Sequence, residues 1–367
     1  MLLREFRRFD PELPIERAHT PPGTWYTDPV IFDEERHRVF EKSWIVVGRA
    51  DQVGNPGDYF TGQITGNPYV VTRGDDGELR AFHNVCRHHA AEVAQECGNC
   101  AELVCRYHGW TYRLDGSLKR APRMGRMLDF EPSRYGLPPV AAATWGPFVL
   151  INLDGSDSRG HSSRGFHEDI AQLAGSLDVS GLDRMKWVER RVYRLNCNWK
   201  VFVDNSLDGG YHVAYAHEGL ASGLEFQGYH TEIHERTAIQ ICGTRGSDAR
   251  LGDQVIYAWL FPNLFINRYG HVMDTNVVIP VSTETCEVVF DFYFDYENLD
   301  AWEVKRTIRK AIEASDAIQR EDITICESAQ RGMRSMAFQQ GRYSEKLERA
   351  VHAFHIMLER ILIDQDV

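Results

Sequence analysis

The stretch Cys86-Arg87-His88 is followed, after sixteen residues, by Cys105-Arg106-Tyr107-His108. Each half contributes one thiol and one imidazole, and these groups bind zinc or an iron–sulfur cluster. The mixed pairs favour a [2Fe–2S] cluster in which one iron takes two thiolates and the other takes two imidazoles. A structural Cys2His2 zinc site is the alternative, although zinc histidines usually form a wider His-x3–5-His pair. We therefore predict that Cys86, His88, Cys105 and His108 hold a [2Fe–2S] cluster.

The other cysteines give no sign of a disulfide framework, because the chain has only eight in 367 residues. Cys97 and Cys100 lie between the two ligand pairs, where a second metal site would lack further ligands, so we expect a plain loop insertion. Four more, in apolar surroundings, are expected in the core: Cys197, Cys242, Cys286 and Cys326. Free thiols beside an oxygen-sensitive cluster indicate the reducing cytoplasm.

Composition narrows the class of protein. A hydrophobic content of 43% in 367 residues is enough for two packed cores. The net charge of −12 and the pI of about 5.7 argue against binding to nucleic acid, which requires a basic face. We find no signal-peptide pattern at the N-terminus and no run of about 18 apolar residues that would span a membrane.

The chain divides into three parts by composition. Residues 1–43 form a proline-rich segment with a short helix near 33–40, expected to pack on the catalytic domain. Residues 44–155 have short strands, among them 44–49, 68–73 and 145–152, separated by turn signals, which predicts a small β-sandwich with the ligand loops at one end. Residues 154–165 are small, polar and Gly/Ser-rich, and they mark the domain boundary.

The remaining part, residues 156–367, is predicted to be an α+β domain. Its expected strands are 187–195, 254–261, 264–268, 272–280 and 287–296, and 218–227 is expected to be rich in loops. Helices are expected over 199–217, 302–333 and 345–362. Strands in the middle and long helices at the end predict an antiparallel sheet with helices packed on one face.

A second metal site is indicated by His212 and His217. Five residues turn an ideal helix by about 500°, which leaves the two side chains about 140° apart. Both can bind one metal only if the helix is distorted or ends between them, and Gly209-Gly210 provides that freedom. Taken alone, a His-x4-His pair is a weak signal, because chance and core packing explain most such pairs.

A third ligand is expected to be a carboxylate, because two histidines and one carboxylate leave open positions on Fe(II). Asp322 falls within the apolar stripe of the 302–333 helix, whereas Glu321 points away from it. A lone carboxylate on an apolar face is costly unless it is paired or bound to metal. A salt bridge, or a more shallowly packed helix, remains the alternative for Asp322.

The cluster motif, with Gly109-Trp110-Thr111-Tyr112 after it, resembles the Rieske domain of the Rieske non-haem iron oxygenases. The segment 198–217 is similar to the family's iron-binding segment, and 321–332 to the segment that carries its carboxylate ligand. The resemblance implies a helix-grip-like catalytic domain. It also implies that His212, His217 and Asp322 hold iron, and that Asn205 belongs to the catalytic residues.

The resemblance further implies a terminal oxygenase that takes electrons from NAD(P)H through a separate reductase, with or without a ferredoxin, and forms a homotrimer. Family members often have an acid three residues before the first iron histidine, as a bridge to the cluster of a neighbouring subunit. Here Gly209 occupies that position and the acid is Asp208, four residues before. Asp208 is therefore the expected electron relay, and Asp204 is the fallback.

Within the family, the segments 207–213, 261–270 and 273–276 are most similar to the choline monooxygenases. This implies hydroxylation of choline or a related quaternary or N-methyl ammonium compound, with aromatic side chains among 257–269 facing the cation. Aromatic residues in a sheet are more often core. The competing hypotheses are an aromatic ring-hydroxylating dioxygenase or demethylase acting on an aromatic acid, an electron carrier, and a zinc-stapled binding module.

Overall fold

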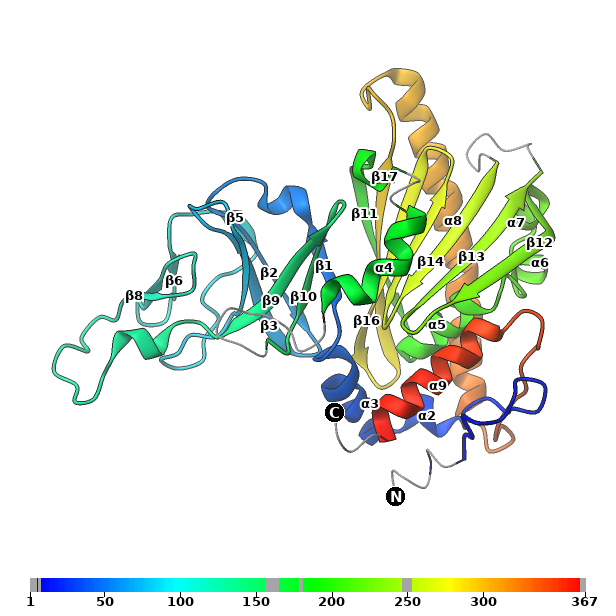
Figure 1. Ribbon diagram of the computed structural model, residues 1–367, viewed down its shortest axis with the longest axis horizontal. Helices are drawn as coiled ribbons and strands as arrows, with labels where there is room; N and C mark the ends of the chain where they lie inside the picture. The colour runs from blue at the N-terminus through cyan, green and yellow to red at the C-terminus, as the bar shows by residue number, and fades with distance from the viewer. Residues whose placement is uncertain (1–4, 6–7, 156–164, 178–180, 246–252, 364–367) are drawn as a thin grey trace. The chain divides into compact units, whose positions relative to one another are not determined.

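The structure, a computed structural model, describes residue 5 and residues 8–155, 165–177, 181–245 and 253–363. The chain forms two compact units. Residues 40–169 make one unit, and residues 1–39 together with 170–367 make the other (Figure 1). Most of the linker predicted at 154–165 lies outside the described residues.

The unit of residues 40–169 is built from two antiparallel sheets. Seven strands form the larger sheet in the order β1-β10-β9-β4-β3-β2-β5, and three short strands form a smaller sheet in the order β6-β7-β8. The bounds are β1 Ile45–Arg49, β2 Asp58–Ile64, β3 Asn67–Arg73, β4 Leu79–His83, β5 Cys97–Asn99, β6 Leu103–Val104, β7 Thr111–Tyr112, β8 Leu118–Arg120, β9 Pro139–Trp145 and β10 Phe148–Asn152.

The hairpin between β2 and β3 shows how local sequence sets this sheet. Thr65 and Gly66 are the only residues between the two strands, and both have positive φ, 48° and 88°. Two consecutive positive φ angles define a type I′ turn, whose twist matches that of the paired strands. The register of Phe60 with Val71 follows, and both side chains are buried.

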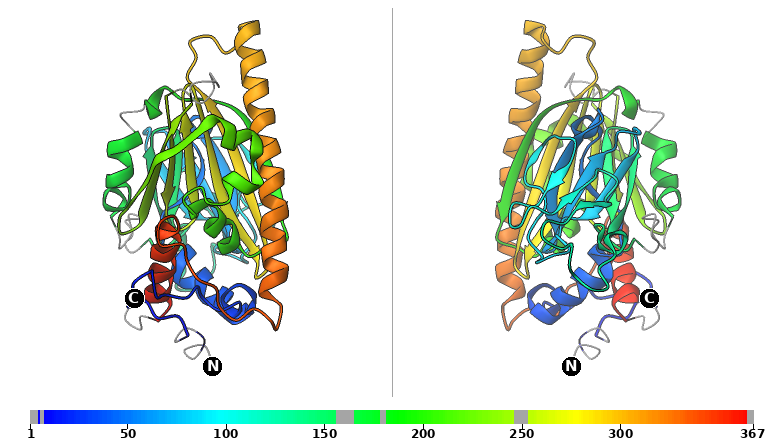
Figure 2. Two further views of the ribbon diagram at one scale, coloured as in Figure 1. Left: turned by 90° about the vertical axis from the view of Figure 1, so that its right-hand side faces the viewer. Right: turned by 90° about the vertical axis from the view of Figure 1, so that its left-hand side faces the viewer.

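The larger unit has a seven-stranded antiparallel sheet in the order β11-β17-β16-β15-β14-β13-β12. Helix α8 runs along one face of this sheet (Figure 2). The strands are β11 Lys186–Leu195, β12 Leu224–Ile233, β13 Thr237–Thr244, β14 Gln254–Leu260, β15 Leu264–Tyr269, β16 Val272–Ser282 and β17 Thr285–Phe294. The helices are α2 Thr24–Thr27, α3 Pro29–Glu35, α4 Phe166–Leu177, α5 Trp199–Leu207, α6 Val213–Ala216, α7 Glu218–Gly223, α8 Trp302–Met333 and α9 Arg349–Ile363.

The predicted α+β class and the 302–333 helix agree with the structure, but two sequence predictions for this unit are wrong. Residues 199–217 do not form one helix, because the chain breaks between α5 and α6 at Gly209 and Gly210. The segment 218–227, expected to be rich in loops, contains α7 and the start of β12. Neither β12 nor β13 was expected. Among the described residues, no helix is both long and apolar enough to cross a membrane.

A buried ion pair joins α3 to α5. The Nζ atom of Lys200 lies 2.5 Å from Oε1 of Glu35, and both side chains are 0% exposed. The Nε1–H of Trp199 donates to the other carboxylate oxygen of Glu35, at 2.8 Å. Burial raises the pKa of Glu35 and lowers the pKa of Lys200, since it disfavours both charged forms, and each partner's charge opposes the shift of the other. The N-terminal segment is thereby fixed to the helix that precedes His212.

We predict that Glu35→Gln lowers the free energy of unfolding by about 3–5 kcal/mol, because it leaves the Lys200 ammonium buried without its counter-ion. The measurement is denaturant unfolding followed by far-UV circular dichroism. Glu34→Gln is the control, since Glu34 forms a partly exposed pair with Arg38 and its loss is expected to cost at most about 1 kcal/mol. Equal losses in the two variants would contradict the structural role of the buried pair.

Candidate metal centres and active site

The two cluster loops have the same backbone geometry. The N–H of Cys86 donates to the carbonyl of Ala91, and the N–H of Cys105 donates to the carbonyl of Trp110, both at 2.8 Å. In each loop the residue four positions after the cysteine has positive φ, 62° at Ala90 and 72° at Gly109. This symmetry could not be predicted from residue type, because Ala90 is not a residue that favours positive φ.

The four predicted cluster ligands meet at the tips of these loops. Cys86 and Cys105 are buried, whereas His88 and His108 lie on the outer side with their Nδ1 atoms 3.2 Å apart. Two inner thiols and two outer imidazoles match the donor set of a Rieske cluster. Cys97 lies instead in β5, paired with Phe60, apart from this group.

Aromatic side chains support the cluster loops. Trp110 stacks on His88, with ring centroids 4.9 Å apart and an interplanar angle of 10°. The hydroxyl of Tyr112 lies 3.4 Å from Sγ of Cys86 and accepts a hydrogen bond from the N–H of Arg87 at 3.0 Å. Burial raises the pKa of Tyr112, so its hydroxyl keeps the proton that it can share with the sulfur of Cys86.

The second group of predicted ligands depends on the break between α5 and α6. Gly209 and Gly210 have φ of 69° and 72°, and a Cβ on Gly209 would lie 2.3 Å from the carbonyl oxygen of Leu347. Only glycine can adopt this positive φ and also lie this close to the backbone of Leu347. The turn sets His212 immediately before α6 and His217 immediately after it, so the two imidazoles do not have to share one ideal helix.

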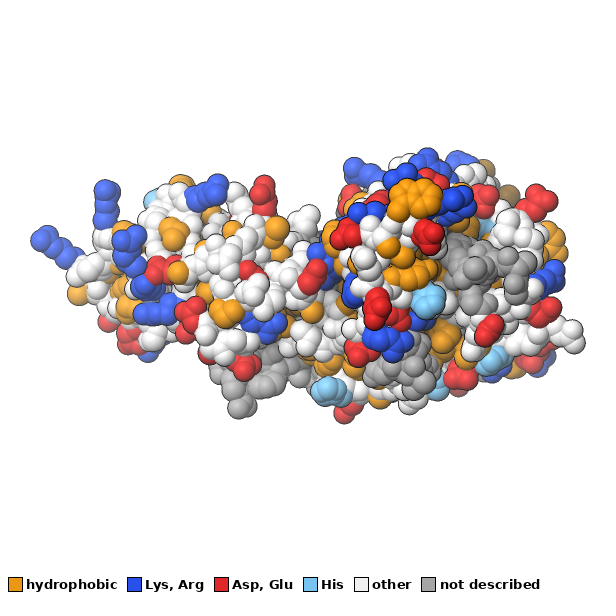
Figure 3. All heavy atoms as spheres, turned by 90° about the horizontal axis from the view of Figure 1, so that it is seen from above, with side chains coloured by type: hydrophobic (Ala, Val, Ile, Leu, Met, Phe, Trp, Pro, Cys, Tyr) orange, Lys and Arg blue, Asp and Glu red, His pale blue; other side chains and the backbone are white. Residues whose placement is uncertain are grey.

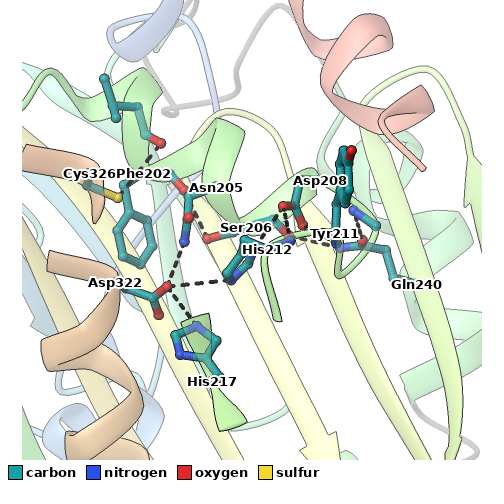
Figure 4. Close-up of polar contacts among 12 residues, drawn as sticks. Phe202, Asn205, Ser206, Asp208, Tyr211, His212, His217, Gln240, Asp322 and Cys326 are labelled. Atoms are coloured by element: carbon teal, nitrogen blue, oxygen red, sulfur yellow. Dashed lines mark hydrogen bonds and ion pairs between the residues drawn. The ribbon is translucent and has the colours of Figure 1, made fainter. Parts of the chain in front are cut away.

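His212, His217 and Asp322 lie together, and each offers a ligand atom within 4.8 Å of the others. The Oδ1 atom of Asp322 is 3.1 Å from Nε2 of His217 and 3.5 Å from Nε2 of His212 (Figure 4). Asn205 donates from Nδ2 to the same oxygen at 2.8 Å. Two neutral imidazole nitrogens and one carboxylate are a donor set that suits Fe(II), so these residues fit the metal predicted from the sequence.

Each imidazole is oriented by an outer carboxylate. Asp208 Oδ2 lies 2.7 Å from Nδ1 of His212, and Glu321 Oε2 lies 2.6 Å from Nδ1 of His217. These contacts leave both Nε2 atoms directed at Asp322. Burial lowers the pKa of His217, but hydrogen bonds and charge from Asp322 and Glu321 outweigh it, so the pKa is raised.

Sequence reasoning missed the contact of Glu321. The helical-wheel argument placed its Cα away from the buried stripe, and its side chain is indeed 48% exposed, but the carboxylate extends back to His217.

Asp204, the fallback relay, contacts other groups. It accepts from the Tyr26 hydroxyl at 2.7 Å and lies 2.9 Å from Nε2 of His355.

A cavity of about 130 Å³ lies between the sheet and the helices that carry these residues. Its lining includes Asp208, His212, His217 and Asp322. The sheet contributes aromatic and polar side chains to the rest of the wall: Tyr257, Phe265, Asn267, Tyr269, Asp274, Asn276 and Phe290. Trp259 and Phe261, two of the aromatic side chains among 257–269 that were expected to face the cation, are buried and do not line it.

Comparison with protein-family models gives two matches. Residues 43–137 match the Rieske [2Fe-2S] domain, and residues 182–363 match the ring hydroxylating alpha subunit catalytic domain. The chain belongs to the Rieske non-haem iron oxygenases, enzymes that carry a [2Fe–2S] cluster and a mononuclear iron. The hypotheses of an isolated electron carrier and of a zinc-stapled module are thereby excluded.

Among its relatives are oxygenases named as monooxygenases. The chain is 44% identical to the chloroplastic choline monooxygenase of Arabidopsis thaliana over 364 residues, covering 96% of this chain and 85% of the relative. It is 30% identical to the carnitine monooxygenase oxygenase subunit of Escherichia coli, covering 95% of both chains. The crystal structure of a quaternary ammonium Rieske monooxygenase in complex with L-carnitine superposes with a TM-score of 0.81 at 28% identity, covering 96% of this chain and 97% of that chain. The predicted family, and the similarity to the choline monooxygenases, are confirmed.

We predict that Glu321→Gln lowers the affinity of the mononuclear site for Fe(II) by about 10- to 100-fold, the usual effect of removing an outer carboxylate from a metal-binding histidine. The measurement is a titration of the metal-depleted protein with Fe(II), together with the visible spectrum of the cluster, which should not change. Glu313→Gln, on an exposed position of the same helix, is the control. Unchanged Fe(II) affinity in Glu321→Gln would show that the contact with His217 has no role in metal binding.

Proposed function

We propose that this protein is the terminal oxygenase of a Rieske system and hydroxylates choline or a related quaternary or N-methyl ammonium compound. The observation that carries this proposal is the cavity beside His212, His217 and Asp322, which combines aromatic walls with buried carboxylate. Aromatic faces attract a quaternary ammonium through the ring quadrupole. The names of the relatives, choline and carnitine monooxygenase, support the same substrate class.

The proposed roles of the ligand residues follow from the donor geometry. Cys86, His88, Cys105 and His108 hold the cluster, and His212, His217 and Asp322 hold Fe(II). When bound, the iron supplies a site at which dioxygen is activated with electrons from the cluster. The protein contributes a small cavity that orients the substrate, and Asn205 holds the Asp322 carboxylate through its amide N–H.

Asp208 is the proposed electron relay, since its carboxylate touches His212 and is 12% exposed, whereas Asp204 has other partners. A relay between cluster and iron on different subunits requires an oligomer, and we propose the homotrimer implied by the family. A solved relative is described in terms of inter-subunit electron transfer, which supports this arrangement.

A separate reductase is the proposed electron donor, and the surface charge near the cluster supports such a partner. Residues 86–134 contain eight Lys and Arg against six Asp and Glu, whereas the whole chain has 41 against 53. All eight of these basic side chains are exposed, and basic groups gather at the end of this unit in Figure 3. Such a surface favours an acidic partner.

The eight free cysteines support a reducing compartment, and we propose the cytoplasm, although the plant relatives are named chloroplastic.

The size of the cavity bears on the rival hypothesis of an aromatic substrate. A 150 Å³ cavity in another protein holds benzene, so about 130 Å³ suits a ligand of that size or smaller. Choline is only slightly larger than benzene, whereas a fused-ring aromatic is far larger. A one-ring aromatic acid is close to the limit, and its carboxylate would meet the carboxylates of the cavity.

We predict oxygen uptake with choline or a related betaine, with stoichiometric hydroxylated product, when the iron-loaded protein is supplied with a Rieske reductase and NADH. Simple aromatic acids are the comparison substrates. His212→Ala is the control, because it should abolish turnover while leaving the cluster spectrum unchanged. Uptake coupled to product only with an aromatic acid would overturn the quaternary ammonium assignment and retain the oxygenase.

We predict that Asp208→Asn reduces turnover by about 10- to 100-fold, while the reductase still reduces the cluster at the normal rate. Asparagine preserves the size of the side chain, but its single amide oxygen can accept from only one of the two backbone N–H groups, of Tyr211 or of His212, that donate to the carboxylate. Stopped-flow measurement of cluster reduction and reoxidation separates the two steps. Slow reoxidation in Asp204→Asn, with normal reoxidation in Asp208→Asn, would transfer the relay to Asp204.

A further inference from the structure

One face of helix α8 forms a polar part of the cavity wall. Four side chains share this face and line the cavity, spaced at i, i+3, i+4 and i+7: Ser315, Ile318, Gln319 and Asp322. Asp322 belongs to the metal site, where Asn205 donates to its carboxylate. Gln319, nearly one turn before Asp322, is a second polar group on this face, and the metal site does not account for it.

Buried glutamines elsewhere in this unit use both ends of the amide. Gln330, on the same helix and 0% exposed, accepts from the N–H of Asn198 at 2.9 Å and donates to the carbonyl of Tyr26 at 3.2 Å. Gln240 on β13 also both accepts and donates. Gln319 is 1% exposed, yet its Nε2 atom has no hydrogen-bond partner among the residues that the structure describes. Since buried polar groups are nearly always paired, this amide is available to a ligand in the cavity that it lines.

The amide of Gln319 places a requirement on any ligand that fills the cavity. Because the cavity is only about 130 Å³, a ligand of the size of choline removes water from the amide when it binds. A ligand without an oxygen at this position leaves the buried N–H unpaired, which is unfavourable. A ligand with an oxygen there restores the hydrogen bond, so the site discriminates between the two.

The charged groups of the wall decide between a hydroxyl and a carboxylate on the ligand. An amide N–H can donate to either. Proteins usually recognise a carboxylate with Arg or Lys, and the described residues of the lining include neither. The carboxylate of Asp322 also lies nearly one turn from Gln319 on the same helix face. A neutral hydroxyl therefore fits this position better than a second carboxylate.

We infer that Gln319 sets the specificity of the cavity by binding the hydroxyl group of an amino alcohol through its amide. This inference rests on the proposed function and narrows its substrate class to quaternary ammonium alcohols, of which choline is the simplest. The hydroxyl of choline is at the opposite end of the molecule from the ammonium group. Gln319 therefore distinguishes choline from other quaternary ammonium compounds of similar size, which share the cation and differ at the other end.

The test compares choline with propyltrimethylammonium, in which a methyl group replaces the hydroxyl and the cation is unchanged. Binding is measured calorimetrically with the iron-loaded protein and without reductase, so that no turnover occurs. We expect the unmodified protein to bind choline about tenfold more tightly, the effect of one hydrogen bond to a buried donor. In Gln319→Met, which keeps the length of the side chain and removes the amide, this ratio should fall to about one, because neither ligand leaves a donor unpaired.

Ile318→Met is the matched control, because Ile318 lines the same cavity from the adjacent position of α8 and has no polar group to lose. This change alters the shape of the wall, so it should shift the affinities for both ligands together and keep their ratio at about tenfold. A change of ratio in Gln319→Met alone cannot come from a general loss of folding, which would weaken both ligands equally.

Three results would overturn the inference and leave the proposed function standing. The first is equal affinity of the unmodified protein for choline and propyltrimethylammonium, and the second is a tenfold ratio that persists in Gln319→Met. The third is tighter binding of glycine betaine than of choline, which would show that the site selects a carboxylate. If the unmodified protein binds none of these three compounds, the proposed function itself fails.

Discussion

The carboxylate of Asp322 is the constraint on which the catalytic unit depends. It lies on the buried face of a 32-residue helix, 9% exposed, within reach of two imidazoles. A carboxylate in this position is stable only if positive charge or donors surround it. Asn205 supplies one donor from α5, and a divalent cation shared with His212 and His217 would supply the charge. The glycine break between α5 and α6 is what brings the two histidines to Asp322.

Asp208 stabilises this break as well as touching His212. Its carboxylate accepts hydrogen bonds from the backbone N–H groups of Tyr211 and His212, and Gln240 on β13 accepts from the N–H of Gly209 at 3.1 Å. Hydrogen bonds thus connect the turn both to Gln240 of the sheet and to Asp208, the residue that precedes the two glycines. A residue proposed to carry electrons therefore also fixes the geometry of its acceptor, and the two functions cannot be varied independently by removing the side chain.

Sequence alone predicted the parts of this protein that depend on residue type and spacing. The candidate ligands and the 302–333 helix were found because metal donors are chemically distinctive and because an amphipathic helix has a clear period. Strand β12 was missed because its middle, Gln227 to Glu232, lacks alternating apolar residues and its pairing with β13 is irregular between Glu225 and His230. Glu321 was missed because a helical wheel locates Cα atoms and ignores the reach of a long side chain. That Asp274 on β16 lines the same cavity as Asp322 on α8 could not be predicted, since only the tertiary fold brings this strand and this helix together.

The formal charges in the cavity favour a cationic substrate. Three carboxylates line it, those of Asp208, Asp274 and Asp322, and no Lys or Arg is among the described residues of its lining. A quaternary ammonium adds positive charge to this acidic wall, whereas an aromatic acid adds a further carboxylate to it. Because an uncompensated charge costs far more in such a space than in water, the same carboxylates that arrange the metal site also discriminate among substrates.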